Sequence, residues 1–475
     1  MAIRIDNRIT AKRLEKKVTK VFELADKKIL SIQRSSKTGT GTPVFTVKGR
    51  YTTRGWTEWT QGFQYGCALL QFDATDERKF LDLGRKNTIK HMASHVSHIG
   101  VHDHGFNNIS TYGNMLRLMH EGRIPADEGE RNFCELALKV SGAVQASRWT
   151  DTEDGTGFIH SFNGAHSLFV DTIRSCRSLG AAHTLGHVLM GEQDQPISLL
   201  QRLAEHAVNT ARYSVYYGEG RDDYDLRGRT VHEAIFNVKN GVFRCPSTQQ
   251  GYSPFSTWTR GLAWSICGFA EQLEFLSSRH WKEQSGRKKA KYSTGLLEMS
   301  FLKAAMATAD FYLENCCRDG IPMWDTGAPN LHRMPRHLDQ KSNPYNPWEP
   351  VDSSAAAIAA QGMLRLGRWL TKNGRKVVNP QRYTRAGLTI ADTLFSEPYL
   401  SEDAKHQGLI QHSIYHRPNG WDYTAPGQKI PNGESSMWGD YHAMELALMI
   451  QREAKGQPYI TFFSGLKQAS APALR

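Results

Sequence analysis

The chain has 475 residues, of which 39% are hydrophobic, so it can bury a sizeable core. Its apolar runs are shorter than the roughly eighteen residues of a membrane span, and its first residues do not resemble a signal peptide. The net charge of +12 could indicate a nucleic-acid partner, but the basic residues are scattered, with Arg287-Lys288-Lys289 as the densest cluster. The seven cysteines contain no CxxC pair, which is typical of reduced thiols. We therefore expect a cytoplasmic protein that binds neither membranes nor nucleic acid.

Twelve segments carry apolar residues at helical spacing, and each is predicted to form a helix. They lie near residues 12–31, 58–72, 76–98, 107–121, 130–147, 165–180, 196–217, 257–276, 295–317, 352–371, 379–396 and 436–452. Asp352-Ser353-Ser354, before the tenth segment, is typical of a helix N-cap. The clearest strand pattern covers residues 231–244, where Asn240-Gly241 predicts a hairpin turn.

These elements predict an all-α fold. Six helical hairpins that close into a ring, an (α/α)6 barrel, are the natural arrangement of twelve helices, with the small β-hairpin at the rim. The longest irregular stretch, residues 318–351, is rich in Pro, Asn and aromatic residues, which is typical of a shaped rim loop rather than of a linker. We expect residues 1–475 to form a single catalytic domain.

The segment 249–264 combines an amide, aromatic rings and a guanidinium directly before and within a predicted helix. Aromatic faces suit the C–H faces of a sugar ring, and a guanidinium fork suits a carboxylate. Each of these residues alone could be a helix start or a core anchor. Together they favour a pocket for an acidic sugar.

Two carboxyl groups could act in such a pocket. Asp103 lies in a turn between two predicted helices, where an Asp is commonly a helix cap. Asp171 lies in an otherwise apolar helix start, so its carboxyl must be hydrogen-bonded, capped or functional. Burial or a second carboxylate nearby would raise the pKa of Asp171 toward that of a proton donor. Paired carboxyls are the usual machinery of glycoside hydrolysis.

A metal site is a further possibility. His91, His95, His98 and His102 are spaced four, three and four residues apart, which would place them on one helical face, with His104 just beyond. The segment lacks a HExxH pattern, and the helix is expected to end before His102. We therefore expect solvated or core histidines and no metal.

Six motifs, in matching order and spacing, resemble the unsaturated glucuronyl hydrolases of glycoside hydrolase family 88 over about residues 50–450. The motifs are Glu58-Trp59-Thr60-Gln61-Gly62-Phe63, His102-Asp103-His104-Gly105-Phe106, Val170-Asp171-Thr172, Gln250-Gly251-Tyr252 with Thr257-Trp258-Thr259-Arg260-Gly261, Asp352-Ser353-Ser354-Ala355-Ala356 and Trp438-Gly439-Asp440-Tyr441. Members of this family have an (α/α)6-barrel fold. They remove a 4,5-unsaturated uronic acid from the non-reducing end of oligosaccharides that polysaccharide lyases release.

The resemblance implies a function and a site. Asp171 would be the catalytic acid and base, and Asp103 the second carboxyl beside it. Six residues would bind the substrate: Trp59, His102, His232, Gln250, Arg260 and Trp264. The enzyme would hydrate the C4=C5 vinyl ether of an unsaturated β-glucuronyl oligosaccharide, without metal or organic cofactor, as a monomer or homodimer.

The chain also departs from the family pattern, with Leu262 where Gln is usual and Pro254-Phe255 where acidic residues are usual. In the segment where some relatives bind a sulfate, only Lys429 is suited to that task. Two alternatives remain open, an unsaturated rhamnogalacturonyl hydrolase and a noncatalytic protein that binds acidic oligosaccharides. A metal-dependent hydrolase using the histidine cluster is a third.

Overall fold

The structure is a computed structural model that describes residues 3–35, 41–54, 58–282, 292–374 and 379–466. The basic cluster at Arg287-Lys288-Lys289 lies outside the described residues. The helices are α1 (Ala11–Ser35), α2 (Gln61–Thr75), α3 (Arg78–His91), α4 (Ala93–Val96), α5 (His104–Asn108), α6 (Asn114–His120), α7 (Glu128–Ser147), α8 (Thr172–Ser175), α9 (Arg177–Thr184), α10 (Leu199–Tyr213), α11 (Thr259–Leu276), α12 (Arg279–Lys282), α13 (Thr294–Asn315), α14 (Ser353–Lys372), α15 (Pro380–Leu394) and α16 (Met437–Ala454).

The strands are short and form small antiparallel sheets. They are β1 (Pro43–Val47), β2 (Arg50–Thr53), β3 (Trp149–Asp151), β4 (Gly157–Ile159), β5 (Ser167–Phe169), β6 (Leu189–Met190), β7 (Pro196–Ile197), β8 (Glu233–Phe236) and β9 (Phe243–Ser247). β1 pairs with β2, β3 with β4 and β6 with β7, and the three-stranded sheet has the order β5-β8-β9.

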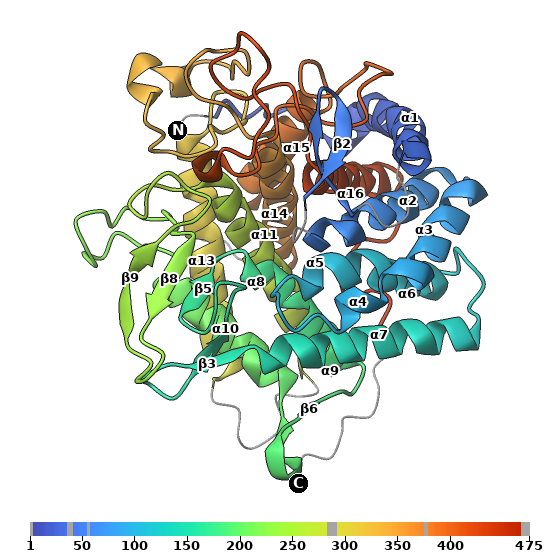
Figure 1. The fold of residues 1–475 in the computed structure, drawn as a ribbon, viewed down its shortest axis with the longest axis vertical. Coiled ribbons are helices and arrows are strands. Elements are labelled where there is room, and N and C mark those ends of the chain that lie inside the picture. The colour runs from blue at the N-terminus through green and yellow to red at the C-terminus, as the bar shows by residue number, and fades with distance from the viewer. Residues whose placement is uncertain (1–2, 36–40, 55–57, 283–291, 375–378, 467–475) are drawn as a thin grey trace.

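The helices form two concentric rings (Figure 1). In the inner ring α2, α5, α8, α11, α14 and α16 each contact the next, and α16 contacts α2, which closes the ring. The outer ring consists of α1, α3, α7, α10, α13 and α15, each of which precedes its inner partner in the chain. The fold is therefore the predicted (α/α)6 barrel.

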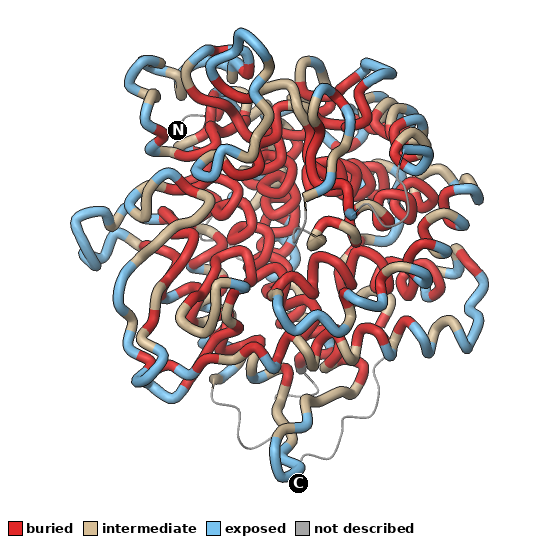
Figure 2. Tube along the Cα trace, in the orientation of Figure 1, coloured by how far each residue is buried: buried red, intermediate tan, exposed pale blue. Residues whose placement is uncertain are grey.

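Burial explains why these sequences take inner or outer places. α11, α14 and α16 are buried along almost their whole length, whereas outer helices such as α3 and α7 bury only one face (Figure 2). α14 begins at the predicted cap, where the Asp352 carboxylate accepts from the backbone N–H groups of Ser354 and Ala355. Small residues then let α14 approach α11 closely, because a Cβ at Gly362 would lie 2.7 Å from the Cys267 nitrogen.

The prediction of one helix over residues 165–180 is wrong in its first part. Residues 167–169 form strand β5, which pairs with β8 so that Leu168 faces Ala234, and helix begins only at Thr172. The predicted hairpin is confirmed as β8 and β9, but β5 makes it a three-stranded sheet. Apolar residues with β-propensity take the strand form here because a partner strand is available to pair with them.

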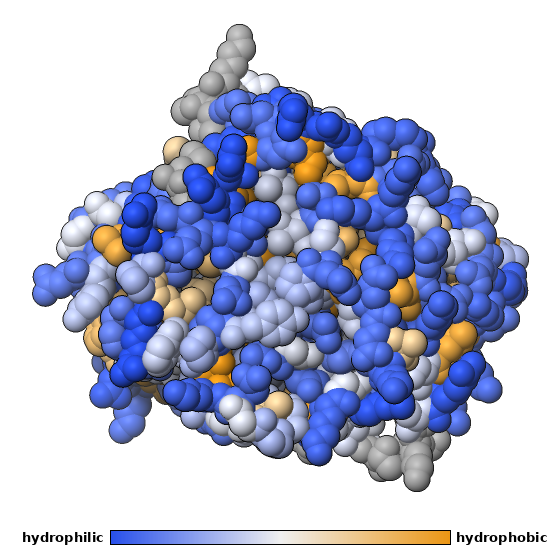
Figure 3. Space-filling view, turned by 90° about the horizontal axis from the view of Figure 1, so that it is seen from above, coloured by the Kyte–Doolittle hydropathy of each residue, from blue (hydrophilic) through white to orange (hydrophobic). Residues whose placement is uncertain are grey.

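Residues 318–351 are irregular, as predicted, with two single 3-10 turns at Leu331–Arg333 and His337–Asp339. Seen from above in Figure 3, the surface is mainly hydrophilic, with apolar side chains in small scattered groups. None of the helices in the described ranges is long and apolar enough to cross a membrane. All seven cysteines are free thiols, and only Cys245 is exposed. That the chain is a single domain stays a prediction.

Candidate active site

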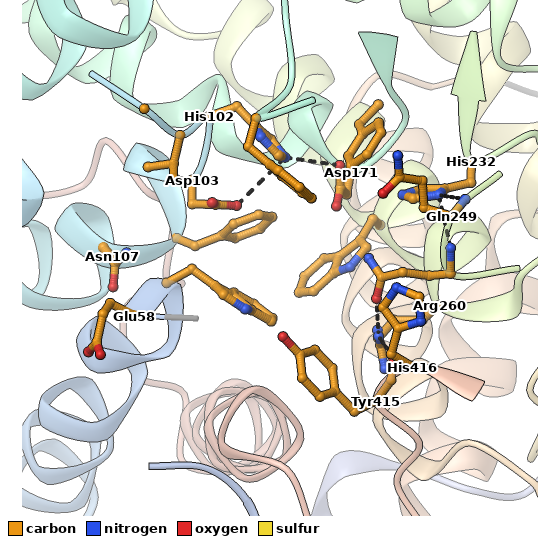
Figure 4. A pocket seen from close by; sticks show the side chains of 18 of the residues that line it. Glu58, His102, Asp103, Asn107, Asp171, His232, Gln249, Arg260, Tyr415 and His416 are labelled. Carbon is orange, nitrogen blue, oxygen red and sulfur yellow. Dashed lines mark hydrogen bonds and ion pairs between the residues drawn. The ribbon is translucent and has the colours of Figure 1, made fainter. Parts of the chain in front are cut away.

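A cavity of about 500 Å³ opens into the barrel, and all eight residues singled out from the sequence line it. These are Trp59, His102, Asp103, Asp171, His232, Gln250, Arg260 and Trp264. In Figure 4 Asp103, His102 and Asp171 lie along one side of the cavity, and Tyr415 and His416 lie on the opposite side.

The barrel brings these residues together from elements far apart in the chain. Asp103 directly precedes α5, and Asp171 follows β5 at the start of α8. His232 directly precedes β8, whereas Arg260 lies in the first turn of α11. Strand pairing positions two of them, because the Val170 N–H donates to the His232 carbonyl at 2.9 Å.

His102 bridges the two carboxyl groups. Its Nε2 lies 3.6 Å from Asp103 Oδ1 and 3.5 Å from Asp171 Oδ1, and all three side chains are buried. Each Asp stands at a helix N-cap position, yet neither side chain accepts a capping hydrogen bond. A structural capping role therefore does not explain these carboxyls, and such a buried cluster is typical of a functional site.

The pKa values of the two carboxyls shift in opposite directions. Burial raises the pKa of Asp103, and His102 offsets only part of that rise. Burial would also raise the pKa of Asp171, but its contact with His102 holds it below the ordinary value. Burial would lower the pKa of His102, but Asp103 and Asp171 hold it above the usual range. The raised pKa expected for Asp171 is therefore wrong, because a positive charge on His102 favours the ionised form of this carboxyl.

The hydrogen bonds of His232 set its tautomer. Its Nδ1 accepts from the backbone N–H groups of Gln249 at 3.0 Å and Gln250 at 3.4 Å. Burial lowers the pKa of His232 to about 4, so the ring is neutral at pH 7 and carries its proton on Nε2. This Nε2 is buried and has no hydrogen-bond partner among the described residues. His232 therefore offers an N–H donor to a ligand in the cavity.

The sequence predicts that the Arg260 guanidinium is a free fork for a carboxylate, and the structure differs. The Arg260 side chain donates to the carbonyls of Ile414 and Tyr415 and, at 2.8 Å, to Gln250 Oε1. It also lies 3.6 Å from the Asp352 carboxylate and is almost completely buried. Arg260 thus orients the Gln250 amide and adds positive charge to the wall of the cavity.

Aromatic rings form the remaining walls. Trp59 stacks on Trp438 at a centroid distance of 5.1 Å, and Trp264 contacts Phe106 at 4.8 Å. Further lining residues that the sequence analysis did not single out as site residues are Glu58, Asn107, Phe162, Tyr415, His416 and Trp421. Glu58 is part of a motif named above, but Tyr415 and Trp421 belong to an irregular segment whose local pattern carries no signal. Lys429 does not line the cavity, and its ammonium lies over the Trp348 ring at 5.7 Å.

The histidines between residues 91 and 104 do not share one helical face, because α3 ends at His91 and α4 begins at Ala93. His95 Nε2 contacts Gln61 Oε1 at 2.7 Å, and His104 contacts Ser141 and the His98 carbonyl. Among the described residues no group of three His, Cys, Asp or Glu side chains is arranged to hold a metal ion.

Several known proteins are similar to this chain in sequence. No family model matches the chain. It is 25% identical over 423 residues to the unsaturated glucuronyl hydrolase of Bacillus sp. (strain GL1), a match that covers 86% of this chain and 90% of that protein. It is 22% identical over 405 residues to the unsaturated chondroitin disaccharide hydrolase of Streptococcus agalactiae serotype III, covering 84% and 82%.

Solved structures agree in fold. The crystal structure of the Bacillus sp. GL1 unsaturated glucuronyl hydrolase superposes with a TM-score of 0.65 at 22% identity, and the match covers 91% of this chain and 97% of that one. A variant of the S. agalactiae enzyme, complexed with dGlcA-GalNAc6S, superposes with a TM-score of 0.61 at 19% identity, covering 97% and 98%.

The fold defines the chain as an (α/α)6-barrel protein, with a buried carboxyl pair in the cavity of the barrel. The similarity extends over most of both chains, in sequence as well as in structure. The chain is thus similar to the unsaturated glucuronyl hydrolases over most of its length.

Proposed function

We propose that the protein is an unsaturated β-glucuronyl hydrolase, which acts on the 4,5-unsaturated uronic acid at the non-reducing end of lyase-generated oligosaccharides. The observation that carries this proposal is the carboxyl pair Asp103 and Asp171, bridged by His102 inside an aromatic-walled cavity. The names of the relatives support the substrate class.

The chemistry of the substrate explains what the site must do. Its C4=C5 double bond forms an enol ether with the ring oxygen, so protonation of C4 leaves positive charge shared by C5 and that oxygen. Water then adds to C5 and gives a hemiketal. The hemiketal opens to a C5 ketone, and the anomeric centre releases the neighbouring sugar with the original glycosidic oxygen.

Asp171 is the group that transfers the protons. It donates a proton to C4 and then, as a carboxylate, accepts one from the attacking water. The raised pKa of His102 and the lowered pKa of Asp171 favour a proton on His102, whose Nε2 lies 3.5 Å from Asp171 Oδ1, so His102 can supply it. The anionic substrate and the exclusion of water both raise the pKa of Asp171 on binding, which favours this transfer.

The other residues orient the substrate. Asp103, with its raised pKa, can hold a sugar hydroxyl as donor or acceptor. His232 presents its Nε2–H, and Gln250 is held by Arg260. Trp59 and Trp264 confine the ring, so that C4 faces the acid.

Isotopic labelling tests this proposal. With an unsaturated glucuronyl disaccharide in heavy water, we expect the ultraviolet absorbance of the substrate to disappear and one deuterium to enter C4 on a single face. In ¹⁸O-water the label should enter at C5, and the glycosidic oxygen should stay with the released sugar. A saturated glucuronide should be inert. Comparable turnover of saturated glucuronides, or no deuterium at C4, would mean an ordinary acid and nucleophile pair instead.

The noncatalytic alternative predicts binding of the disaccharide without loss of absorbance. The rhamnogalacturonyl alternative predicts faster turnover of the unsaturated galacturonyl-rhamnose disaccharide than of the glucuronyl one. The same panel of substrates therefore separates all three functions.

A further inference from the structure

Arg148 is a buried cation beside the acid cluster, and it does not line the cavity. It directly follows the end of α7. Its Nε donates to the His160 carbonyl at 3.1 Å, its Nη2 to the Ser161 carbonyl at 2.5 Å, and its Nη1 to the Ile99 carbonyl. Each of the three guanidinium nitrogens thus donates a hydrogen bond to a backbone carbonyl.

These carbonyls belong to two segments at the cavity. Residues 99–103 lead into the acid cluster, ending with His102 and Asp103. Residues 160–162 end with Phe162, whose ring stacks on His102 at a centroid distance of 6.1 Å and an angle of 13°. Both segments are irregular and have no ladder hydrogen bonds that join them. One guanidinium therefore joins the segment that carries two site residues to the segment that covers them.

The charge of Arg148 is also unusual. Buried cations are generally paired with a carboxylate, because an isolated charge is costly in a low-dielectric interior. Among the described residues no carboxyl lies within 4 Å of this guanidinium, and Asp103 is the carboxylate that acts on it at longer range. Three backbone carbonyls stabilise this charge, but no carboxylate of the described residues neutralises it at contact distance, so its field reaches Asp103 and His102.

We propose that Arg148 is a positioning residue for the proposed hydrolase, which joins residues 99–103 to residues 160–162 and keeps a positive charge near Asp103. This inference rests on the proposed function. Arg148 acts through Asp103 and His102 and does not touch the substrate.

The electrostatic consequence has a definite sign. Asp103 faces His102, Asp171, Arg148 and His98, and Arg148 is one of the groups that lower its pKa. His102 faces Asp103, Asp171 and Arg148 and also interacts with His160, His206 and His232, whose lowered pKa values keep them neutral at pH 7; Arg148 again lowers the pKa of His102. A positive charge disfavours protonation of both groups, so removing it raises both pKa values.

Two substitutions separate charge from packing. Arg148→Met keeps an unbranched stem but removes the charge and all donors, whereas Arg148→Lys keeps the charge and loses the fork. Arg202→Met is the matched control, because Arg202 is a half-buried arginine that donates to the Ala146 carbonyl and lies over Trp149 at 4.5 Å, outside the cavity.

The assay is the pH profile of kcat/KM on an unsaturated glucuronyl disaccharide, with folding checked by circular dichroism. For Arg148→Met we expect kcat to fall about 10- to 100-fold. Because the pKa values of Asp103 and His102 both rise, we also expect both limbs of the pH profile to move to higher pH by about 0.5–1 unit. Arg148→Lys should lower kcat but leave both limbs in place, and Arg202→Met should leave both kcat and limbs unchanged.

If Arg148→Met does not fold, Arg148→Lys still decides, because unaltered kcat or displaced limbs in that variant would overturn the proposal. Folded Arg148→Met with unmoved limbs would overturn it as well. Inactivity of the wild-type protein on the disaccharide would instead refute the proposed function, so the two failures are distinguishable.

Discussion

Replacing Asp171 by Asn tests the proposed chemistry directly, because the amide keeps the shape of the side chain and cannot transfer the proton. General acid–base catalysis contributes about 10²–10⁴-fold, which corresponds to roughly 3–5 kcal/mol of transition-state stabilisation. The side chain is 11% exposed and lies 3.5 Å from His102, so bulk water is poorly placed to replace it. We therefore expect kcat to fall at least about 100-fold in Asp171→Asn.

The assay follows the loss of the ultraviolet absorbance of the unsaturated uronate under single-turnover conditions, so that binding and chemistry are separated. Asp440→Asn is a matched control, since Asp440 is also a buried carboxyl but accepts hydrogen bonds from Leu409, Ile410 and Tyr51 outside the cavity. It should lose stability and keep the turnover of its folded fraction. A folded Asp171→Asn that retained about a tenth of wild-type turnover would remove Asp171 from the mechanism.

The pH dependence of the melting temperature should reveal the ion pair between Asp171 and His102. The lowered pKa of Asp171 stabilises the fold above its unfolded pKa, and this contribution is lost as pH falls through the folded pKa. The raised pKa of His102 stabilises the fold below its ordinary value of about 6.5, and this is lost as pH rises through the folded pKa. Asp171→Asn removes the first contribution and weakens the second. Its Tm, compared with wild type by calorimetry, should therefore fall most between about pH 4 and 6.5, and a pH-independent difference would contradict the ion pair.

Three further outcomes are expected. His232→Ala should lower kcat/KM about 10- to 100-fold, because the variant lacks the Nε2–H donor. The limbs of the pH profile should not move, because the ring is already neutral with a pKa of about 4. A displaced limb would show that His232 titrates in the working pH range. Exhaustive EDTA treatment should leave the rate unchanged, and activity that zinc restores after chelation would reassign the mechanism. Disaccharides with an unsulfated second sugar should react faster than 6-sulfated ones, because Lys429 lies over Trp348 rather than in the cavity. Lys429→Ala should not change the ratio of the two rates. Equal rates for the two disaccharides would contradict this prediction.

Local sequence pattern determined the barrel. The spacing of apolar residues along each segment depends on which helix faces are buried, so it predicted the helices of both rings and the Asp352 cap of α14. The hairpin at residues 231–244 could be predicted for the same reason, because its turn residues are local. The resemblance to the family also named eight residues that line one cavity, six of them within the ordered motifs, although their roles stay predictions.

Contacts between distant segments decided the rest. β5 became a strand because β8, more than sixty residues later, pairs with it, which no local pattern records. Arg260 donates to carbonyls 154 and 155 positions further along the chain, so its guanidinium is not the free fork that the sequence predicts. The pKa values of Asp103 and Asp171 depend on which carboxylate His102 neutralises more strongly in the buried site. Burial and long-range charge are properties of the packed barrel, and only the tertiary structure determines them.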